Sequence, residues 1–183
     1  MKTKDILLTA LKLFLICAVA AGLLAAVNGV TAKKIDEINT QNALAAQKEV
    51  LPDAVSFEDL TLTDGAAGAA GKDADGNTVG YVFTTSANSY GGTLKLMTGF
   101  DADGAVTGIS ILEINDTPGL GMNAKRPDWL GQFKGRTDDL QVTKDGGTGD
   151  AAIDAITSAT ITSRAVVSAV NAARELYREA AAQ

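Results

Sequence analysis

Residues 73–111 read DADGNTVGYVFTTSANSYGGTLKLMTGFDADGAVTGISI, and this central stretch carries the clearest indication of the fold. The tetrapeptide DADG occurs twice, at 73–76 and at 101–104, and each copy precedes a run of β-branched and aromatic residues. Asp and Gly favour tight turns, whereas β-branched and aromatic side chains favour strands. We therefore expect two hairpin turns that lead into strands.

Outward from this stretch, the pattern predicts strands followed by helices. Strands are expected at Gly80–Thr85, Thr93–Phe100, Val106–Ile114 and Leu140–Thr143, and helices at Ile35–Gln47, Pro127–Phe133 and Thr162–Ala182. Because hairpins connect the central strands and no crossover pattern separates them, the expected class is α+β with a largely antiparallel sheet.

The carboxyl-terminal helix has the most regular pattern. Its apolar residues recur at helical spacing, at Ala165, Val166, Ala169, Val170, Ala173, Leu176 and Tyr177. Charged residues accompany them, at Arg164, Arg174, Glu175 and Arg178. This spacing predicts an amphipathic helix with its apolar side on the core.

Near the amino terminus, residues 13–32 form an uncharged run of twenty, LFLICAVAAGLLAAVNGVTA. As a helix this length spans the roughly 30 Å hydrocarbon core of a membrane, so we expect a transmembrane helix in contact with lipid. Three lysines precede the run, and two, Lys33 and Lys34, follow it. By the positive-inside rule, we expect a single-pass protein of the cell (inner) membrane with its soluble domain on the extracytoplasmic side.

Two alternatives to a retained anchor stay open. Val30-Thr31-Ala32 suits a signal-peptide cleavage site, but the run exceeds the usual h-region of roughly 7 to 15 residues. Lipidation of Cys17 would need a small residue before it, where Ile16 stands. With the anchor retained, the expected divisions are a cytoplasmic segment (1–12), the membrane helix (13–32), a membrane-proximal helix and linker (33–72), and a folded domain (73–183).

The composition excludes several kinds of chemistry. The formal net charge of the 183 residues is −6, and such a chain lacks the clustered cations that bind nucleic acid. It has no histidine, the commonest general base and metal ligand. Its single cysteine, Cys17, lies in the apolar run, so we expect neither an internal disulfide nor a metal site. Any chemistry here is therefore expected to come from a cofactor.

Residues 154–163 read DAITSATITS and stand where the carboxyl-terminal helix begins. The first backbone N–H groups of a helix are unpaired and the dipole is positive there, so such a place favours a phosphate group. The same run also fits an ordinary helix cap, because Thr160, Thr162 and Ser163 carry hydroxyl groups that can accept from those N–H groups. Taken without any comparison, the residues favour the cap.

Asp154 to Thr160 resembles the flavin-transferase acceptor pattern, Asp-x-x-(Ser/Thr)-Gly-Ala-Thr, of a family of FMN-binding domains. This family is shared by the G subunit of Rnf-type electron-transport complexes and the C subunit of sodium-translocating NADH:quinone reductase. Its last threonine carries flavin mononucleotide (FMN) as a phosphoester, which implies the same for Thr160. Asp154, Thr157 and Ala159 match the pattern, whereas Ser158 stands in place of glycine.

Two further stretches resemble the Rnf G subunit. Residues 89–100 read SYGGTLKLMTGF, and residues 117–121 read TPGLG. By themselves, Tyr90-Gly91-Gly92 and residues 117–121 are turns, since Pro presets φ and Gly permits positive φ. The family usually has Glu before the second stretch, where this chain has Asp116. The resemblance implies a loop lying against the flavin, and a site that includes Tyr90, Thr117, Gly119, Leu120 and Gly121.

The resemblance implies that residues 73–183 are an FMN-binding domain behind a single transmembrane helix. FMN on Thr160 would relay electrons between other membrane and redox subunits of an Rnf-like complex, which oxidises ferredoxin, reduces NAD and moves ions. A flavin transferase would install the FMN, and the protein would not turn over alone. Two alternatives stay open: a C-type subunit of a sodium-translocating NADH:quinone reductase, and a non-redox, membrane-anchored binding or assembly module with Thr160 unmodified.

Overall fold

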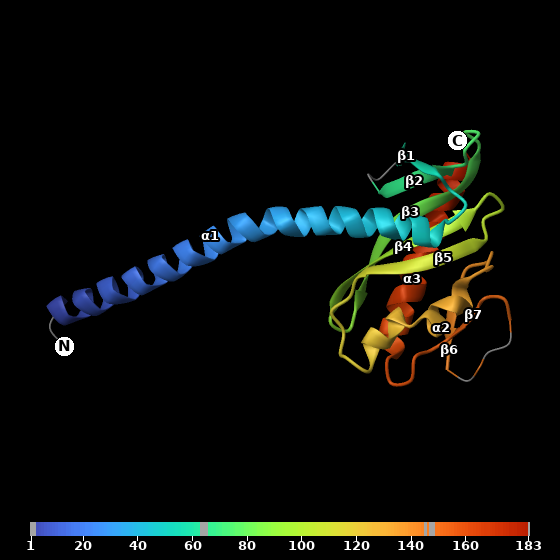
Figure 1. Ribbon diagram of the computed structural model, residues 1–183. Coiled ribbons are helices and arrows are strands. Elements are labelled where there is room, and N and C mark those ends of the chain that lie inside the picture. Colours follow the sequence, from blue (N-terminus) through green and yellow to red (C-terminus); the bar gives the residue numbers. More distant parts are fainter. Residues whose placement is uncertain (1–2, 63–65, 145, 147–148, 183) are drawn as a thin grey trace. The chain divides into compact units, whose positions relative to one another are not determined.

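Figure 1 shows a long amino-terminal helix followed by strands and a carboxyl-terminal helix. This computed structural model describes residues 3–62, 66–144, 146 and 149–182. The chain separates into two compact units, Met1–Asn42 and Ala43–Gln183. In chain order the elements are α1 (Thr3–Val50), β1 (Ser56–Thr61), β2 (Ala67–Lys72), β3 (Thr78–Ser89), β4 (Gly92–Asp101), β5 (Val106–Glu113), η1 (Gly121–Lys125), α2 (Pro127–Leu130), η2 (Gly131–Phe133), β6 (Gln141–Thr143), β7 (Ala152–Asp154) and α3 (Thr160–Ala181).

Helix α1 contains the apolar run and continues without a break through the helix predicted at Ile35–Gln47. Its 48 residues extend about 72 Å at 1.5 Å per residue, well beyond the thickness of a bilayer core. Among the described residues it is the one helix that is long and apolar enough to cross a membrane. Within the Met1–Asn42 unit its large apolar side chains are exposed, Leu13, Phe14, Leu15, Ile16, Leu23 and Leu24 among them, as a lipid environment requires.

The sheet of the Ala43–Gln183 unit has five strands in the order β1-β2-β3-β4-β5, and every neighbouring pair is antiparallel. The two DADG turns join β2 to β3 and β4 to β5, as predicted. In the first, Asp73 Oδ1 accepts from the N–H of Asn77 at 2.8 Å, and in the second, Asp101 Oδ1 accepts from the N–H of Ala105 at 2.9 Å. The predicted α+β class with a largely antiparallel sheet is confirmed.

Strands β1 and β2 lie within residues for which the sequence predicts a linker. Strand β2 reads AGAAGK, and Gly and Ala are poor strand formers, so propensity gives no indication of it. Packing explains the small residues: a Cβ on Gly71 would lie 2.4 Å from Leu51 Cδ2, and one on Gly68 would lie 2.7 Å from Phe83 Cδ1. The three-residue strand β7, which pairs in parallel with β6, is likewise absent from the prediction.

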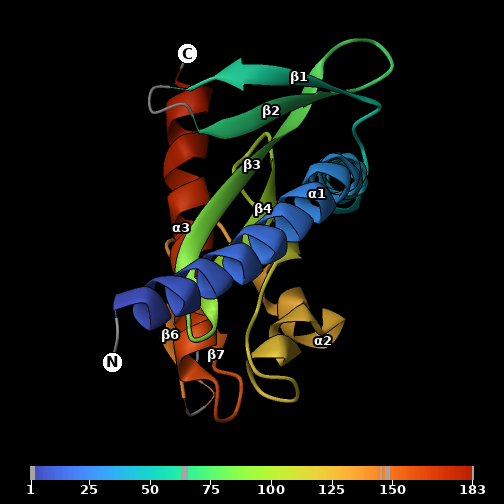
Figure 2. The same ribbon diagram turned by 90° about the vertical axis from the view of Figure 1, so that its left-hand side faces the viewer.

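The core lies on both faces of the sheet because successive residues of β4 point to opposite sides. On one face, Leu96 and Phe100 belong to a cluster that includes Val166 and Val170 of α3, and Figure 2 shows α3 running along the sheet. On the other face, Met97 belongs to a cluster formed with the last turn of α1 and the residues after it, Ala46, Val50, Leu51 and Ala54.

Arg174 is buried in α3, although the sequence pattern groups it with the charged residues of that helix. It is 2% exposed, and its guanidinium donates to the carbonyl oxygens of Gly104 at 2.9 Å and Arg136 at 3.0 Å. Its Cζ also lies 5.3 Å from the ring centroid of Phe100, a cation–π distance. Through its hydrogen bond to Gly104, Arg174 therefore holds α3 against the second DADG turn.

Candidate functional site

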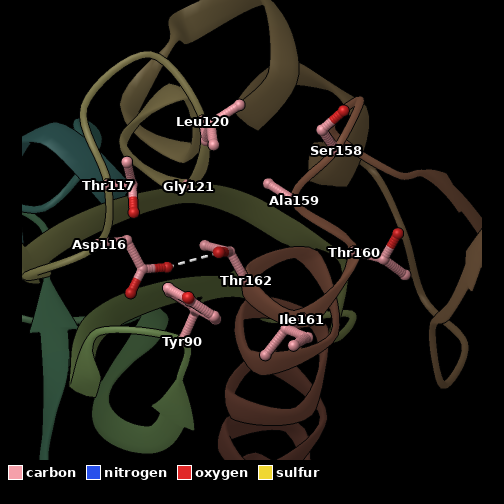
Figure 3. A pocket seen from close by; sticks show the side chains of 10 residues that line it. All are labelled: Tyr90, Asp116, Thr117, Leu120, Gly121, Ser158, Ala159, Thr160, Ile161 and Thr162. Atoms are coloured by element: carbon pink, nitrogen blue, oxygen red, sulfur yellow. Dashed lines mark hydrogen bonds between the residues drawn. The ribbon is translucent and has the colours of Figure 1, made fainter.

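Three segments that are distant in the sequence meet at the amino-terminal end of α3. They are the turn between β3 and β4, the loop that follows β5, and the first turn of α3 (Figure 3). Together they enclose a cavity of about 450 Å³, a volume typical of sites for small molecules. The cavity is lined by Tyr90, Asp116, Thr117, Leu120, Gly121, Ser158, Ala159, Thr160, Ile161 and Thr162.

The amino terminus of α3 is open to an anion. Its N-cap residue, Ala159, provides no side-chain hydrogen bond, and the first turn contains no acidic residue. Counted from the start of α3, the first backbone N–H group with an i−4 acceptor is that of Ser163, which donates to Ala159 O at 3.0 Å. Within the part of the chain that the structure describes, the N–H groups of residues 160–162 have no acceptor. These groups and the helix dipole suit a phosphate.

The hydroxyl groups at this helix terminus differ in their environment. Thr162 and Ser163 are buried: Thr162 donates to Asp116, and Ser163 Oγ accepts from the N–H of Ile156 at 2.9 Å and donates to Ala159 O at 3.0 Å. Thr160 is half-buried, and its side chain points away from Asp116 (Figure 3). No described residue makes a hydrogen bond with it. The Thr160 hydroxyl therefore does not act as a helix cap.

Ser158 is the non-glycine residue with a positive φ, +61°, among those that the structure describes. This left-handed conformation costs an L-residue roughly 1 kcal/mol, whereas glycine adopts it freely. The backbone thus accounts for the glycine that the acceptor pattern has at this place. Serine keeps the same turn at some cost in strain.

The backbone at the start of the acceptor segment is held by one side chain of α2 and one of η2. The indole Nε1 of Trp129 donates to Asp154 O at 2.7 Å, and the N–H of Asp154 donates to Gln132 Oε1 at 2.8 Å. The exposed carboxylate of Asp154 accepts from Thr143 Oγ1 at 3.2 Å. Trp129 and Gln132 therefore fix where β7 ends, and Asp154 itself lines neither this cavity nor its neighbour.

The structure brings most of the predicted site residues together. Seven line the 450 Å³ cavity: Tyr90, Thr117, Leu120, Gly121, Ser158, Ala159 and Thr160. Thr157 and Gly119 line a neighbouring cavity of about 510 Å³, which shares Leu120 and Ser158 with the first, and Asp154 lines neither. The sequence gives no indication that Ile161 and Thr162 belong to the site beyond their adjacency to Thr160. Contact of any of these residues with a flavin stays a prediction.

The rim of the cavity is apolar. Tyr90 is 70% exposed, Leu120 42% and Ile161 56%. In the described part of the Ala43–Gln183 unit, the other large apolar residues with such exposure are Leu44 and Val55. Three of five exposed apolar side chains therefore surround one cavity, and such a concentration marks a binding surface.

Asp116 forms the polar wall of the cavity. Its carboxylate accepts from Ser89 Oγ at 2.5 Å, from the N–H of Gly91 at 2.6 Å and from the hydroxyl of Thr162. Burial acts to raise the pKa of Asp116, but the hydrogen bonds from Ser89, Thr162 and Gly91 outweigh it, so the pKa lies below its ordinary value. The carboxylate is ionised at neutral pH.

Comparison with known proteins identifies the domain and then the family. The FMN-binding domain family matches residues 89–175, which contain the entire 450 Å³ cavity. The G subunit of the Na⁺-translocating ferredoxin:NAD⁺ oxidoreductase complex of Acetobacterium woodii is 41% identical, over 91% of this chain and 88% of that protein. The G subunit of the ion-translocating oxidoreductase complex of Methanosarcina acetivorans is 34% identical, over 93% and 94%. The chain belongs to this G-subunit family.

Membership of the G-subunit family confirms the resemblance to Rnf-type G subunits drawn from the sequence. It makes the chain a redox subunit of a multi-subunit, ion-translocating oxidoreductase, and its FMN-binding domain supports FMN as the cofactor. Together with the apolar helix α1, the membership also supports membrane anchoring.

Solved structures share the fold of this G-type protein at lower identity. The C subunit of the Na⁺-translocating NADH-quinone reductase of Parabacteroides distasonis superposes with a TM-score of 0.53 at 22% identity, over 64% of this chain and 62% of that chain. NqrC of Shewanella oneidensis gives a TM-score of 0.51 at 20% identity, over 66% and 65%. At such identities the likeness establishes the common fold alone.

Proposed function

We propose that this G-type protein carries FMN as a phosphoester on Thr160 and relays electrons between other subunits of an Rnf-like ferredoxin:NAD oxidoreductase. The observation that carries the proposal is the Thr160 hydroxyl. It is half-buried at the start of α3, faces no hydrogen-bond partner among the described residues, and borders the cavity. Thr160 also occupies the last position of the acceptor pattern.

The residues around Thr160 fit FMN. A phosphate on its Oγ1 would lie at the terminus where the N–H groups of residues 160–162 are unpaired, so its charge would be offset there. The exposed side chains of Tyr90, Leu120 and Ile161 offer an apolar lining that suits the faces of a flavin ring. The 450 Å³ volume leaves space for a ligand of this size.

FMN, when bound, supplies reversible acceptance and donation of electrons. The chain's own residues then need only hold the cofactor, orient it and limit the access of water. This division of labour agrees with a chain that has no histidine and whose single cysteine lies in the apolar helix. We infer that the apolar rim limits hydration of the ring, and that the unpaired N–H groups of α3 hold its phosphate.

The membrane anchor supports the relay by restricting the domain to a thin layer beside its partner proteins. Such confinement raises the effective concentration of the carrier, so a weak and transient contact suffices for electron exchange. Maturation requires a flavin transferase that reaches Thr160, and the exposure of the neighbouring Thr157 and Ser158 is compatible with such access.

The intact mass of the full chain tests the attachment. Coexpressed with a flavin transferase and purified in detergent, the wild type should gain the mass of FMN less one water, and Thr160→Ala should gain nothing. Thr137→Ala, a substitution outside both cavities, is the matched control and should keep the addition. A Thr160→Ala variant that still gains this mass refutes the proposal, and an unmodified wild type supports the non-redox alternative.

The lysine distribution around α1 supports a cytoplasmic amino terminus and an extracytoplasmic domain. A single thiol at the exposed Asp103, in a Cys17→Ser background, reports the side of the membrane. The Asp103→Cys thiol should react with an impermeant maleimide in intact cells whose outer membrane is permeabilised. Labelling only after the inner membrane is broken would place the domain in the cytoplasm.

A further inference from the structure

Asp116 connects the three segments that form the cavity. Ser89 ends β3, Gly91 lies in the turn to β4, and Thr162 belongs to the first turn of α3. All three donate to this one carboxylate, which is 5% exposed although it lies on a loop. The turn that carries Tyr90 and the helix start that carries Thr160 are thereby tied to the same side chain.

The space around the Asp116 carboxylate is closely packed. A Cβ on Gly121 would lie 2.5 Å from Asp116 Oδ2 and 2.6 Å from Thr162 Oγ1. A Cβ on Gly91 would lie 2.1 Å from the carbonyl oxygen of Asn115 and 2.9 Å from the Cα of Asp116. Glycine is required at both places, so the carboxylate has little freedom to move.

The charge of Asp116 is offset by dipoles. No lysine or arginine in the described ranges forms an ion pair with it. Its compensation comes from three hydrogen-bond donors and from the positive end of α3. A net negative charge therefore stays fixed in the wall of the cavity, where partial burial weakens the screening by solvent.

We propose that Asp116 is a positioning residue that also lowers the reduction potential of the flavin, by holding the Tyr90 turn against α3 and fixing a negative charge in the cavity wall. This inference rests on the proposed function, because it requires FMN at this cavity. Reduction adds electrons to the ring, and a nearby negative charge opposes the added electron density. The donors from Ser89 and Thr162 partly neutralise that charge.

The two parts of this role predict shifts of opposite sign in the midpoint potential. Asp116→Asn removes the charge and should move the potential to a more positive value. Ser89→Ala and Thr162→Val each remove one donor while the charge stays, so each should move it to a more negative value. A purely structural role would loosen the site in all three variants and move the potential in one direction.

The measurement is a dye-coupled redox titration of the full chain, purified in detergent after coexpression with a flavin transferase. Ser86→Ala is the control, because Ser86 lies in β3 outside the 450 Å³ cavity, and it should leave the potential unchanged. Shifts of the same sign in all three variants, or no shift in Asp116→Asn, overturn the inference. If Asp116→Asn does not fold, the test rests on Ser89→Ala and Thr162→Val. A midpoint potential that is unchanged or more positive in both of these variants overturns the inference.

Intact mass separates this inference from the proposed function. If the wild type carries FMN but the potentials of the variants shift against the predicted signs, the role of Asp116 is refuted and the attachment at Thr160 is not. A wild type without added mass removes the attachment itself.

Discussion

Replacement of the buried Arg174 by methionine should destabilise the domain strongly. Methionine keeps an unbranched apolar stem but removes the guanidinium donors to the carbonyl oxygens of Gly104 and Arg136, of which the Arg136 oxygen still accepts from the N–H of Val106 at 3.0 Å. Each hydrogen bond from a charged donor contributes roughly 1.5–3 kcal/mol. The Nε of Arg174 is buried and lies 4.0 Å from Asp139 Oδ1, an ion-pair distance that is too long for a hydrogen bond, so its removal returns at most about 1 kcal/mol. The expected net loss is therefore about 2–5 kcal/mol.

Arg178→Met is the matched control, one turn further along α3. Its side chain is 48% exposed and pairs with Asp139 and Glu175 at the surface, so its loss should cost at most about 1 kcal/mol. Urea unfolding of the full chain in detergent, followed by fluorescence, reports the domain directly because the single tryptophan, Trp129, is buried there. Equal losses in the two variants would refute the assigned role of Arg174.

Further predictions concern backbone strain, packing and pH. Ser158→Gly should stabilise the domain by up to about 1 kcal/mol in the same unfolding assay, because glycine removes the strain at φ +61°; a loss of stability would show that the serine side chain matters more. Gly99→Ala should lower stability by about 1–3 kcal/mol, because its Cβ would lie 2.4 Å from the carbonyl oxygen of Val50, whereas Gly131→Ala, with open space around it, should be near neutral. The pKa of Asp116 is lowered in the folded protein, so its contribution to stability is present above its ordinary value of 3.8 and is lost as the pH falls towards the folded value. Below about pH 4, unfolding free energy should therefore fall more steeply with acidification in the wild type than in Asp116→Asn, and parallel curves would contradict this.

The elements that sequence reasoning recovers are those in which local preference and tertiary packing agree. The strands after each DADG turn combine turn chemistry with β-branched residues, and α3 has apolar residues at helical spacing. Strand β2 is not predicted because its glycines are required by packing against the side chains of Leu51 and Phe83, which lie outside the strand's own sequence. Its composition therefore resembles that of a linker.

The candidate site is predictable to the extent that its residues are consecutive. The acceptor segment and the TPGLG loop stand out as motifs, but their convergence with the Tyr90 turn depends on the sheet and on α3. The sequence marks Asp116 as a departure from the family's glutamate, and its three donors come from positions 27, 25 and 46 residues away. Asp154 shows the opposite: its motif position is clear, yet its side chain lines neither cavity.

The attachment of FMN to Thr160 is tested most directly by tandem mass spectrometry of the tryptic peptide 145–164, DGGTGDAAIDAITSATITSR, from the full chain coexpressed with a flavin transferase. We expect one FMN phosphoester, with the fragment ions placing it on Thr160. An adduct on Thr157, Ser158, Thr162 or Ser163, or a peptide that carries no adduct while the transferase modifies another acceptor in the same cells, would contradict this attachment.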